Sequence, residues 1–243
     1  MTNSLLPVVM LAFTLSQGFS QATSDTAFLS NAIDHVVEQH ARATRENAGV
    51  FHGIEYMEPE RKDAQHPYFG SEEWTTGTVV FDRQPYRNMS LLYDITSDQL
   101  ITETPSGEVI ALIKEKVNEF SLGERKFVQI ENEQVANSLP RSGFYQVLYD
   151  GRTRVVAMRI KDIHRYMDGS YVQIDFKERS RYFLYKEGAY HPVSSKSSLL
   201  HVLFNNKQLV KEFMKKNQIR FDKNEDWAFV QVARFYDTLS THP

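Results

Sequence analysis

The sequence predicts an α+β protein in which a curved antiparallel β-meander is packed by an N-terminal helix and a C-terminal helical unit. Apolar residues recur at helical spacing near both ends of the chain, whereas the middle alternates with a period of two. The aromatic triplets Leu92–Asp94, Leu148–Asp150 and Leu184–Lys186 each stand before a turn signal. Three hairpins entered by one short signature indicate a single continuous meander.

The chain starts with an apolar run from Leu5 to Leu15, which small and polar residues follow as far as Ala22. The run is too short to span a membrane, so we expect residues 1–20 to be a signal peptide. Because no Lys or Arg precedes the run, an uncleaved anchor is the alternative. We expect the exported chain to have no transmembrane span.

The composition narrows the class of protein. The 243 residues include no cysteine, so the exported chain forms no disulfide and residues 1–20 are not a lipoprotein signal. The formal net charge of −3, together with export, argues against nucleic-acid binding. A cysteine-free and nearly neutral exported chain fits a bacterial periplasm or an outer-membrane-associated location.

The first predicted element is a helix from Ser24 to Asn47. It has a single apolar stripe, made of Phe28, Leu29, Ala32, Ile33, Val36 and Val37. Ser24 or Asp25 is suited to cap its start, and Asn47-Ala48-Gly49 is suited to end it. A helix with one apolar stripe should lie on another element, so residues 21–196 are predicted to form one domain of this helix and the antiparallel sheet.

The predicted sheet is curved. Residues 74–81 alternate as a strand, and Gly77 within them indicates a bulge or a close approach. Residues 109–120 are compatible with a short helix, but the turn signals that bound them favour one long strand. Residues 155–161 have one apolar face, whereas residues 144–149 are apolar on both faces. Such a mixture predicts strong curvature, with helices covering part of the sheet.

Three dipeptides predict tight hairpins in the second half of the chain. Asp150-Gly151 and Asp168-Gly169 favour two-residue turns with positive φ. Glu187-Gly188 is a weaker version of the same signal. These turns connect the strands that we expect to complete the meander.

The apolar period becomes helical after His191-Pro192. The pattern predicts three short helices: one capped by Ser197 or Ser198, one over Lys207–Asn217 and one from about Asn224. Because about 45 residues are too few for an independent core, we expect residues 197–243 to form a helical unit docked on the sheet.

The chain has no recognisable catalytic or metal-binding motif. No serine lies in a nucleophile elbow, and no Gly-rich loop opens a helix. The closest metal motif is His35 with His40, but a spacing of five places the two side chains about 140° apart around a helix. Glu38 is within reach of His35, and no third ligand follows. We therefore expect no catalytic residue, no metal site and no cofactor.

Asp94 and Asp150 occupy equivalent positions in the recurring triplets, which permits a functional interpretation. The favoured interpretation is that each aspartate initiates its turn by bonding to its own backbone. The alternative is a hydrolase whose carboxylates converge only in the fold. A deep cleft that combines two or three carboxylates with His52 or His164 would favour that alternative.

The strongest charge feature lies between positions 196 and 223, where seven basic residues stand against two acidic ones. On the predicted second helix the basic side chains form a stripe opposite Leu209 and Phe213. We predict that this stripe binds an anionic membrane surface or an acidic partner, and that the binding residues are Lys207, Lys211, Lys215 and Lys216. A solvated helix face is the alternative.

Three strings carry a resemblance: HPYFGSEEWTTGTVVFDRQPYRNMSLLYDITSDQL, GFYQVLYDG and YFLYKEGAYHPVSSKSSLL. They resemble a family of uncharacterised secreted proteins of Gram-negative bacteria that are rich in outer-membrane transporters. The likeness extends to the closing KEFMKKNQIRFDKNEDWAFVQVARFYDTL and implies export, but no activity. At the level of fold, a helix beside a curved sheet is also similar to the periplasmic lipoprotein carriers, although this chain has an extra helical tail and no carrier motif.

Taken together, these features predict a secreted, non-enzymatic protein that is a binding or accessory module of the bacterial envelope. Its partner would be an apolar ligand held between sheet and helix, or an envelope protein. Besides the hydrolase, a structural component of an outer-membrane complex is the remaining alternative.

Overall fold

A computed structural model describes residues 49–59, 65–131, 142–169 and 171–239. The described elements all belong to one compact unit, Ala48–Pro243. The predicted signal peptide and the predicted helix at residues 24–47 lie outside the described residues.

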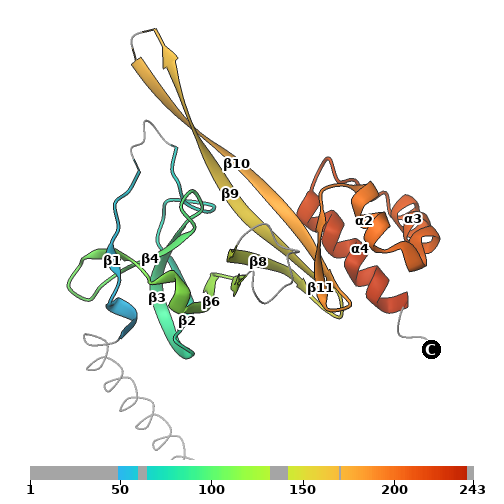
Figure 1. Cartoon of the computed structure of the whole chain (residues 1–243), viewed down its shortest axis with the longest axis horizontal. Helices are drawn as coiled ribbons and strands as arrows, with labels where there is room; N and C mark the ends of the chain where they lie inside the picture. Colours follow the sequence, from blue (N-terminus) through green and yellow to red (C-terminus); the bar gives the residue numbers. More distant parts are fainter. Residues whose placement is uncertain (1–48, 60–64, 132–141, 170, 240–243) are drawn as a thin grey trace, which may run out of the picture. The chain divides into compact units, whose positions relative to one another are not determined.

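In the described part of the chain, eleven antiparallel strands form one sheet with the order β1-β5-β4-β3-β2-β6-β7-β8-β9-β10-β11 (Figure 1). The strands are β1 (Ile54–Glu55), β2 (Thr75–Phe81), β3 (Gln84–Asp94), β4 (Gln99–Glu103), β5 (Val109–Ala111), β6 (Val117–Leu122), β7 (Arg125–Ile130), β8 (Gly143–Asp150), β9 (Arg154–Asp168), β10 (Tyr171–Lys186) and β11 (Ala189–Val193). The helices are α2 (Lys196–Val202), α3 (Lys207–Lys216) and α4 (Glu225–Leu239), with short 3-10 turns η1 (Gly49–Phe51), η2 (Lys114–Lys116) and η4 (Phe204–Asn206). The predicted α+β class with an antiparallel sheet is therefore confirmed in this form.

The prediction of one long strand over residues 109–120 is wrong. Strand β5 ends at Ala111, the turn η2 follows, and β6 begins at Val117. β5 pairs with β4, whereas β6 pairs with β2 and β7, so the chain crosses from one part of the sheet to another. The meander is consequently not continuous, and consists of β2–β5 and β6–β11. Alternation in a sequence does not specify which neighbour a strand will pair with.

One of the three hairpin turns matches its sequence signal. Glu187 and Gly188 have φ values of 53° and 86° and join β10 to β11 as a two-residue turn. The connection between β9 and β10 begins at Gly169, with a φ of 60°, one residue later than the predicted Asp168-Gly169 turn, because Asp168 pairs with Tyr171. The prediction of a two-residue turn at Asp150-Gly151 is wrong, because Asp150 pairs with Arg154 across a three-residue loop. Tertiary hydrogen bonds from this loop to α4, described below, account for its extra residue.

Gly77 lies at an irregularity of β2, as the sequence predicts. The register between β2 and β3 shifts between Gly77 and Val79. A Cβ atom at Gly77 would lie 1.9 Å from the carbonyl oxygen of Ser121 on β6. The glycine therefore permits a close approach of two backbones that no other residue allows without displacement.

The sheet curls so strongly that strands distant in its order come into contact. The backbone N–H of Lys161 on β9 donates to the carbonyl oxygen of Ile95, just after β3, over 3.1 Å. Four strands separate β3 from β9 in the sheet order. The enclosed side is filled by aromatic rings, which are those of Tyr93, Phe120, Phe127 and Phe144. These rings pack against one another and fill the space that the curled sheet encloses.

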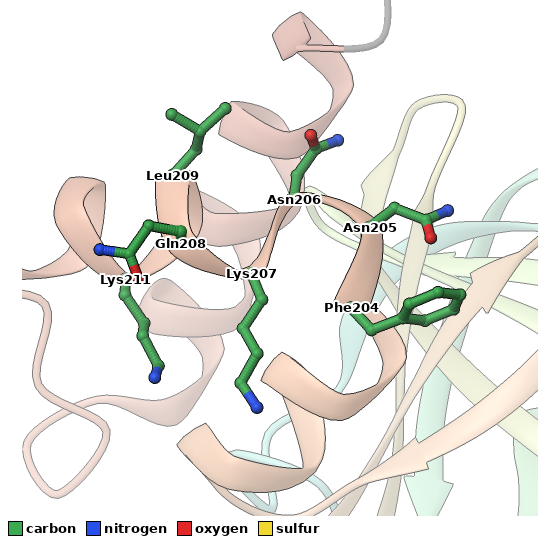
Figure 2. A pocket seen from close by; sticks show the side chains of 7 residues that line it. All are labelled: Phe204, Asn205, Asn206, Lys207, Gln208, Leu209 and Lys211. Carbon is green, nitrogen blue, oxygen red and sulfur yellow. The ribbon is translucent and has the colours of Figure 1, made fainter.

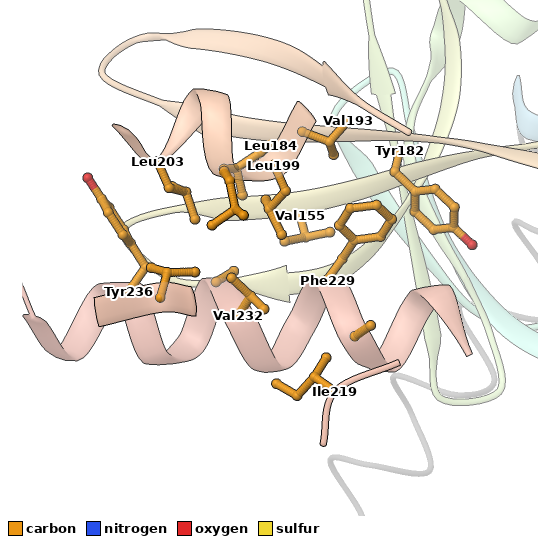
Figure 3. Close-up of a cluster of buried hydrophobic side chains, with 14 of the residues drawn as sticks. Val155, Tyr182, Leu184, Val193, Leu199, Leu203, Ile219, Phe229, Val232 and Tyr236 are labelled. Carbon is orange, nitrogen blue, oxygen red and sulfur yellow. The ribbon is translucent and has the colours of Figure 1, made fainter. Parts of the chain in front are cut away.

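The three C-terminal helices all pack on one face of the sheet, over strands β8–β11. Figure 3 shows α4 side chains such as Phe229 and Val232 packed against Val155 and Leu184 of the strands. The predicted cap at Ser197 or Ser198 is wrong, because Ser195 caps α2 and forms a reciprocal capping box with Ser198. The helices and the sheet share one continuous apolar cluster.

Candidate functional site

Arg159 is the centre of a buried polar cluster between the sheet and α4. Its side chain is 7% exposed and donates to Gln146, Ser180 and both carboxylate oxygens of Asp226. The hydroxyl of Tyr182 donates to the same carboxylate over 2.8 Å. Burial, and then this hydrogen bond, raise the pKa of Tyr182. Every charged group here has a partner within the fold, so the cluster fixes α4 to β9.

Asp98 is the centre of a second buried cluster. Its carboxylate accepts the Tyr93 hydroxyl at 2.6 Å, the Lys114 ammonium at 2.5 Å and the backbone N–H of Phe144 at 3.4 Å. Asp98 itself has a φ of 59°, a conformation that aspartate tolerates in turns. Because its donors come from β3, η2 and β8, the carboxylate joins the two separated parts of the meander.

A pocket of about 420 Å³ contains two of the carboxylates that the hydrolase alternative requires, Asp94 and Asp162. Its lining residues are Met57, Pro59, Asp94, Thr96, Ser97, Gln99, Lys161, Asp162 and Ile163. The Asp94 carboxylate accepts the backbone N–H groups and hydroxyls of Thr96 and Ser97, and also the hydroxyl of Tyr56. The prediction that Asp94 initiates its own turn is confirmed.

The remaining charged groups of this pocket are also engaged. The Lys161 ammonium donates to the carbonyl oxygens of Tyr68 at 2.6 Å and His66 at 3.0 Å, and burial lowers its pKa. Asp162 forms a salt bridge with Arg179, and its pKa is held low by that hydrogen bond. With these groups committed to the fold, the pocket has no carboxylate placed as a free general base.

The other residues considered from the sequence do not converge on this pocket. Asp150 pairs with Arg154 across its hairpin at 2.7 Å. His52 follows η1 and His164 lies on β9, both exposed, and neither lines the pocket. Within the described ranges, no three His, Asp or Glu side chains are grouped so that they would hold a metal ion. His35, Glu38 and His40 lie outside the described residues.

The loop before β9 is held by α4 and explains the failed turn prediction. The Asp237 carboxylate accepts the backbone N–H and hydroxyl of Thr153 and the hydroxyl of Tyr149. A Cβ atom at Gly151 would lie 2.4 Å from the Asp237 carboxylate. This contact spans more than eighty residues of sequence, so the local Asp-Gly signal does not reveal it.

The predicted basic stripe lies on α3 with every lysine exposed. We define the lysine face as the four exposed lysines of α3: Lys207, Lys211 and Lys215, which lie within about 80° of one another around the helix axis, and Lys216, which lies about 100° beyond Lys215. Val210 and Met214 anchor the helix in the core and lie beside Lys207 around its axis, so the lysines flank the buried side of α3. Leu209 projects away from Lys207 and Lys211, as predicted, but it is 47% exposed and does not anchor the helix (Figure 2).

No lysine of this face forms a salt bridge with any residue that the structure describes. The nearby acidic side chains have other partners. Glu212 accepts from Gln208 at 2.9 Å, and Asp222 pairs with Arg220 at 2.6 Å. The lysine face therefore presents four positive charges that the described part of the protein leaves without an ion-pair partner.

A shallow pocket of about 340 Å³ adjoins the lysine face where α2 gives way to α3 (Figure 2). Its lining consists of Phe204, Asn205, Asn206, Lys207, Gln208, Leu209 and Lys211, without a carboxylate. Phe204 is 66% exposed, although the sequence pattern assigns it to the apolar side of the first helix. The helix ends at Val202, and η4 turns Phe204 outward. The polar pair Asn205-Asn206 is the signal that would have indicated this break.

None of the helices in the described part of the chain combines the length and apolarity needed to cross a membrane. No protein-family model, curated protein or solved structure matches the chain. The resemblance to a secreted bacterial family therefore stays a prediction from the quoted strings.

Proposed function

We propose that this protein is an exported, non-enzymatic binding module of the bacterial envelope that attaches to an acidic partner through the lysine face. The observation that carries the proposal is four exposed lysines on one helix without an ion-pair partner among the described residues. Unpaired charges of one sign create a surface potential that attracts a partner of opposite sign. Export itself is supported by the apolar run from Leu5 to Leu15.

The filled interior of the sheet supports a partner on the surface over an apolar ligand inside. Four aromatic rings pack on one another on the enclosed side, with Phe120 and Phe127 stacked at 4.7 Å. The space between sheet and helices is filled in the same way by the cluster shown in Figure 3. The sheet thus serves as a rigid support for the helical unit.

The hydrolase alternative has less support, because the carboxylates that line the pocket of about 420 Å³ are committed to structural hydrogen bonds. Asp94 accepts five hydrogen bonds, and Asp162 is paired with Arg179. A structural component of an outer-membrane complex is a special case of the proposal, in which the partner is permanent.

Crosslinking in intact bacterial cells tests the proposal. The test variant is Lys207→Glu, Lys211→Glu, Lys215→Glu. A matched control is Lys116→Glu, Lys126→Glu, Lys177→Glu, which changes the net charge equally at exposed positions on η2, β7 and β10. We expect the test variant to lose crosslinked products and the control to keep them. Equal recovery of products from both variants contradicts the proposal.

A further inference from the structure

We infer that the acidic partner of the lysine face is the anionic surface of a lipid bilayer, and that Phe204 enters its headgroup region. The inference rests on the proposed function and adds the class of partner. It is drawn from the kind of basic residue, the neighbouring apolar side chain and the chemistry of the adjoining pocket.

All four cations of the face are lysines. A lysine ammonium is a compact point charge on a flexible stem, whereas an arginine presents a planar fork that matches one carboxylate in fixed geometry. From Lys207 to Lys215, eight residues further along the chain, the helix rises about 12 Å. A row of flexible point charges of this length suits a surface of many mobile anionic headgroups better than a single ordered acidic side chain.

Phe204 supplies an apolar contact beside these charges. Its ring is two-thirds exposed, and the Lys186 ammonium lies 5.4 Å from the ring centroid. Lys186 is itself held by Glu187 at 2.7 Å, so it orders the ring without adding a free charge. An exposed aromatic side chain next to lysines is the combination by which peripheral proteins enter the boundary between headgroups and acyl chains.

The pocket between Phe204 and Lys211 offers donors to a phosphate. Three of its lining side chains are amides and two are ammonium groups, and none is a carboxylate. Figure 2 shows Lys207 and Lys211 extending on the same side of the helix, with Asn205 beside Phe204. A lipid phosphate seated there would meet positive charge and hydrogen-bond donors while the acyl region meets the ring.

Co-sedimentation with vesicles tests the inference. The purified protein is mixed with vesicles of phosphatidylcholine alone or with added phosphatidylglycerol. We expect binding only to the anionic vesicles, weakened by salt. Neutralising three of the lysines (Lys207→Gln, Lys211→Gln, Lys215→Gln) should reduce the affinity about 100-fold, at about fivefold for each charge.

Two further variants separate the aromatic contribution from the charge. Phe204→Ala should weaken binding to anionic vesicles about tenfold without changing its salt dependence. Trp74→Ala, which removes an exposed aromatic side chain just before β2 and outside this pocket, should leave binding unchanged. Equal effects of these two variants contradict the role assigned to Phe204.

Failure of the inference is distinguishable from failure of the proposed function. If the protein ignores anionic vesicles while its crosslinking in cells still requires the lysines, the partner is an acidic protein and the lipid inference is overturned. If neither vesicle binding nor crosslinking depends on the lysines, both are overturned. Equal binding to neutral and anionic vesicles also contradicts the inference.

Discussion

Arg159 and Asp226 form a two-point salt bridge that ties β9 to the first turn of α4, with nitrogen–oxygen distances of 2.6 and 3.1 Å. The pair is one polar connection between the sheet and α4, and another is formed by Asp237 near the end of that helix. Removal of Asp226 leaves the buried guanidinium of Arg159 without a counter-charge. Asp226→Ala should therefore lower the free energy of unfolding by about 3 kcal/mol, the low end for such pairs because Asp226 is partly exposed.

Replacing both partners gives the control for this prediction. The double variant Arg159→Met, Asp226→Leu removes both charges and keeps a similar side-chain volume. It should therefore be more stable than Asp226→Ala. Denaturant unfolding of the three proteins checks the order. A double variant less stable than the single one contradicts the account of the cluster.

Gly77→Ala should destabilise the protein by about 2–3 kcal/mol, because the new Cβ would meet a backbone oxygen of β6 at 1.9 Å. Two strands would have to separate to make room. Gly49→Ala is the matched control, since a Cβ there meets nothing within 4 Å. Thermal unfolding of both variants is the measurement, and similar midpoints would show that the approach of β2 and β6 is not tight.

The protein should lose stability as the pH rises above about 10. Burial is the main cause that raises the pKa of five tyrosines above the ordinary value of 10.0. The five are Tyr56, Tyr68, Tyr149, Tyr182 and Tyr190. The pKa of Tyr68 rises to about 12. The unfolded chain releases these protons first, so it binds fewer protons than the folded protein and the free energy of unfolding falls with pH. Lys161, whose pKa is lowered, acts in the opposite direction, but it is one group against five.

Denaturant unfolding between about pH 9 and pH 11 measures this loss. Tyr182→Phe should reduce the dependence on pH, because one of the raised groups is absent. Phenolate absorbance provides an independent check, since the buried tyrosines should ionise together with unfolding. Stability that stays constant through this range contradicts the prediction.

Ser195→Ala should cost about 1 kcal/mol, because its hydroxyl accepts the backbone N–H of Ser198 and completes the capping box. Ser197→Ala should be almost neutral, although Ser197 is one of the caps that the sequence suggests. Urea unfolding separates the two variants. If Ser197→Ala is the more damaging change, the helix starts later than the structure places it.

The local elements of the sheet were largely predictable. Alternation and turn residues place the strands, and Glu187-Gly188 forms the expected turn because its φ requirement is local. The sequence does not show equally well which strands pair with one another. Residues 109–120 divide between two parts of the sheet, and the Asp150 loop has an extra residue because Asp237 binds it. Both features depend on contacts between residues far apart in the sequence.

The candidate site shows the same division. The lysines of α3 could be found from their spacing, since an i, i+4 row on an apolar helix remains on one side. The sequence does not show that these lysines lack ion-pair partners among the described residues. Only the fold shows that Glu212 bonds to Gln208 and Asp222 to Arg220. The exposure of Phe204 could not be predicted either, because a helical period alone does not show where a helix ends.

The most direct test of the lysine face is co-sedimentation of the purified protein with isolated bacterial envelope membranes. Wild type, the lysine-face variant with glutamate at 207, 211 and 215, and the control with glutamate at 116, 126 and 177 are compared over a range of salt concentrations. We expect wild type and control to pellet with the membranes at low salt and to dissociate as the salt concentration rises. The lysine-face variant should stay in the supernatant throughout. Identical behaviour of the two glutamate variants would contradict this expectation.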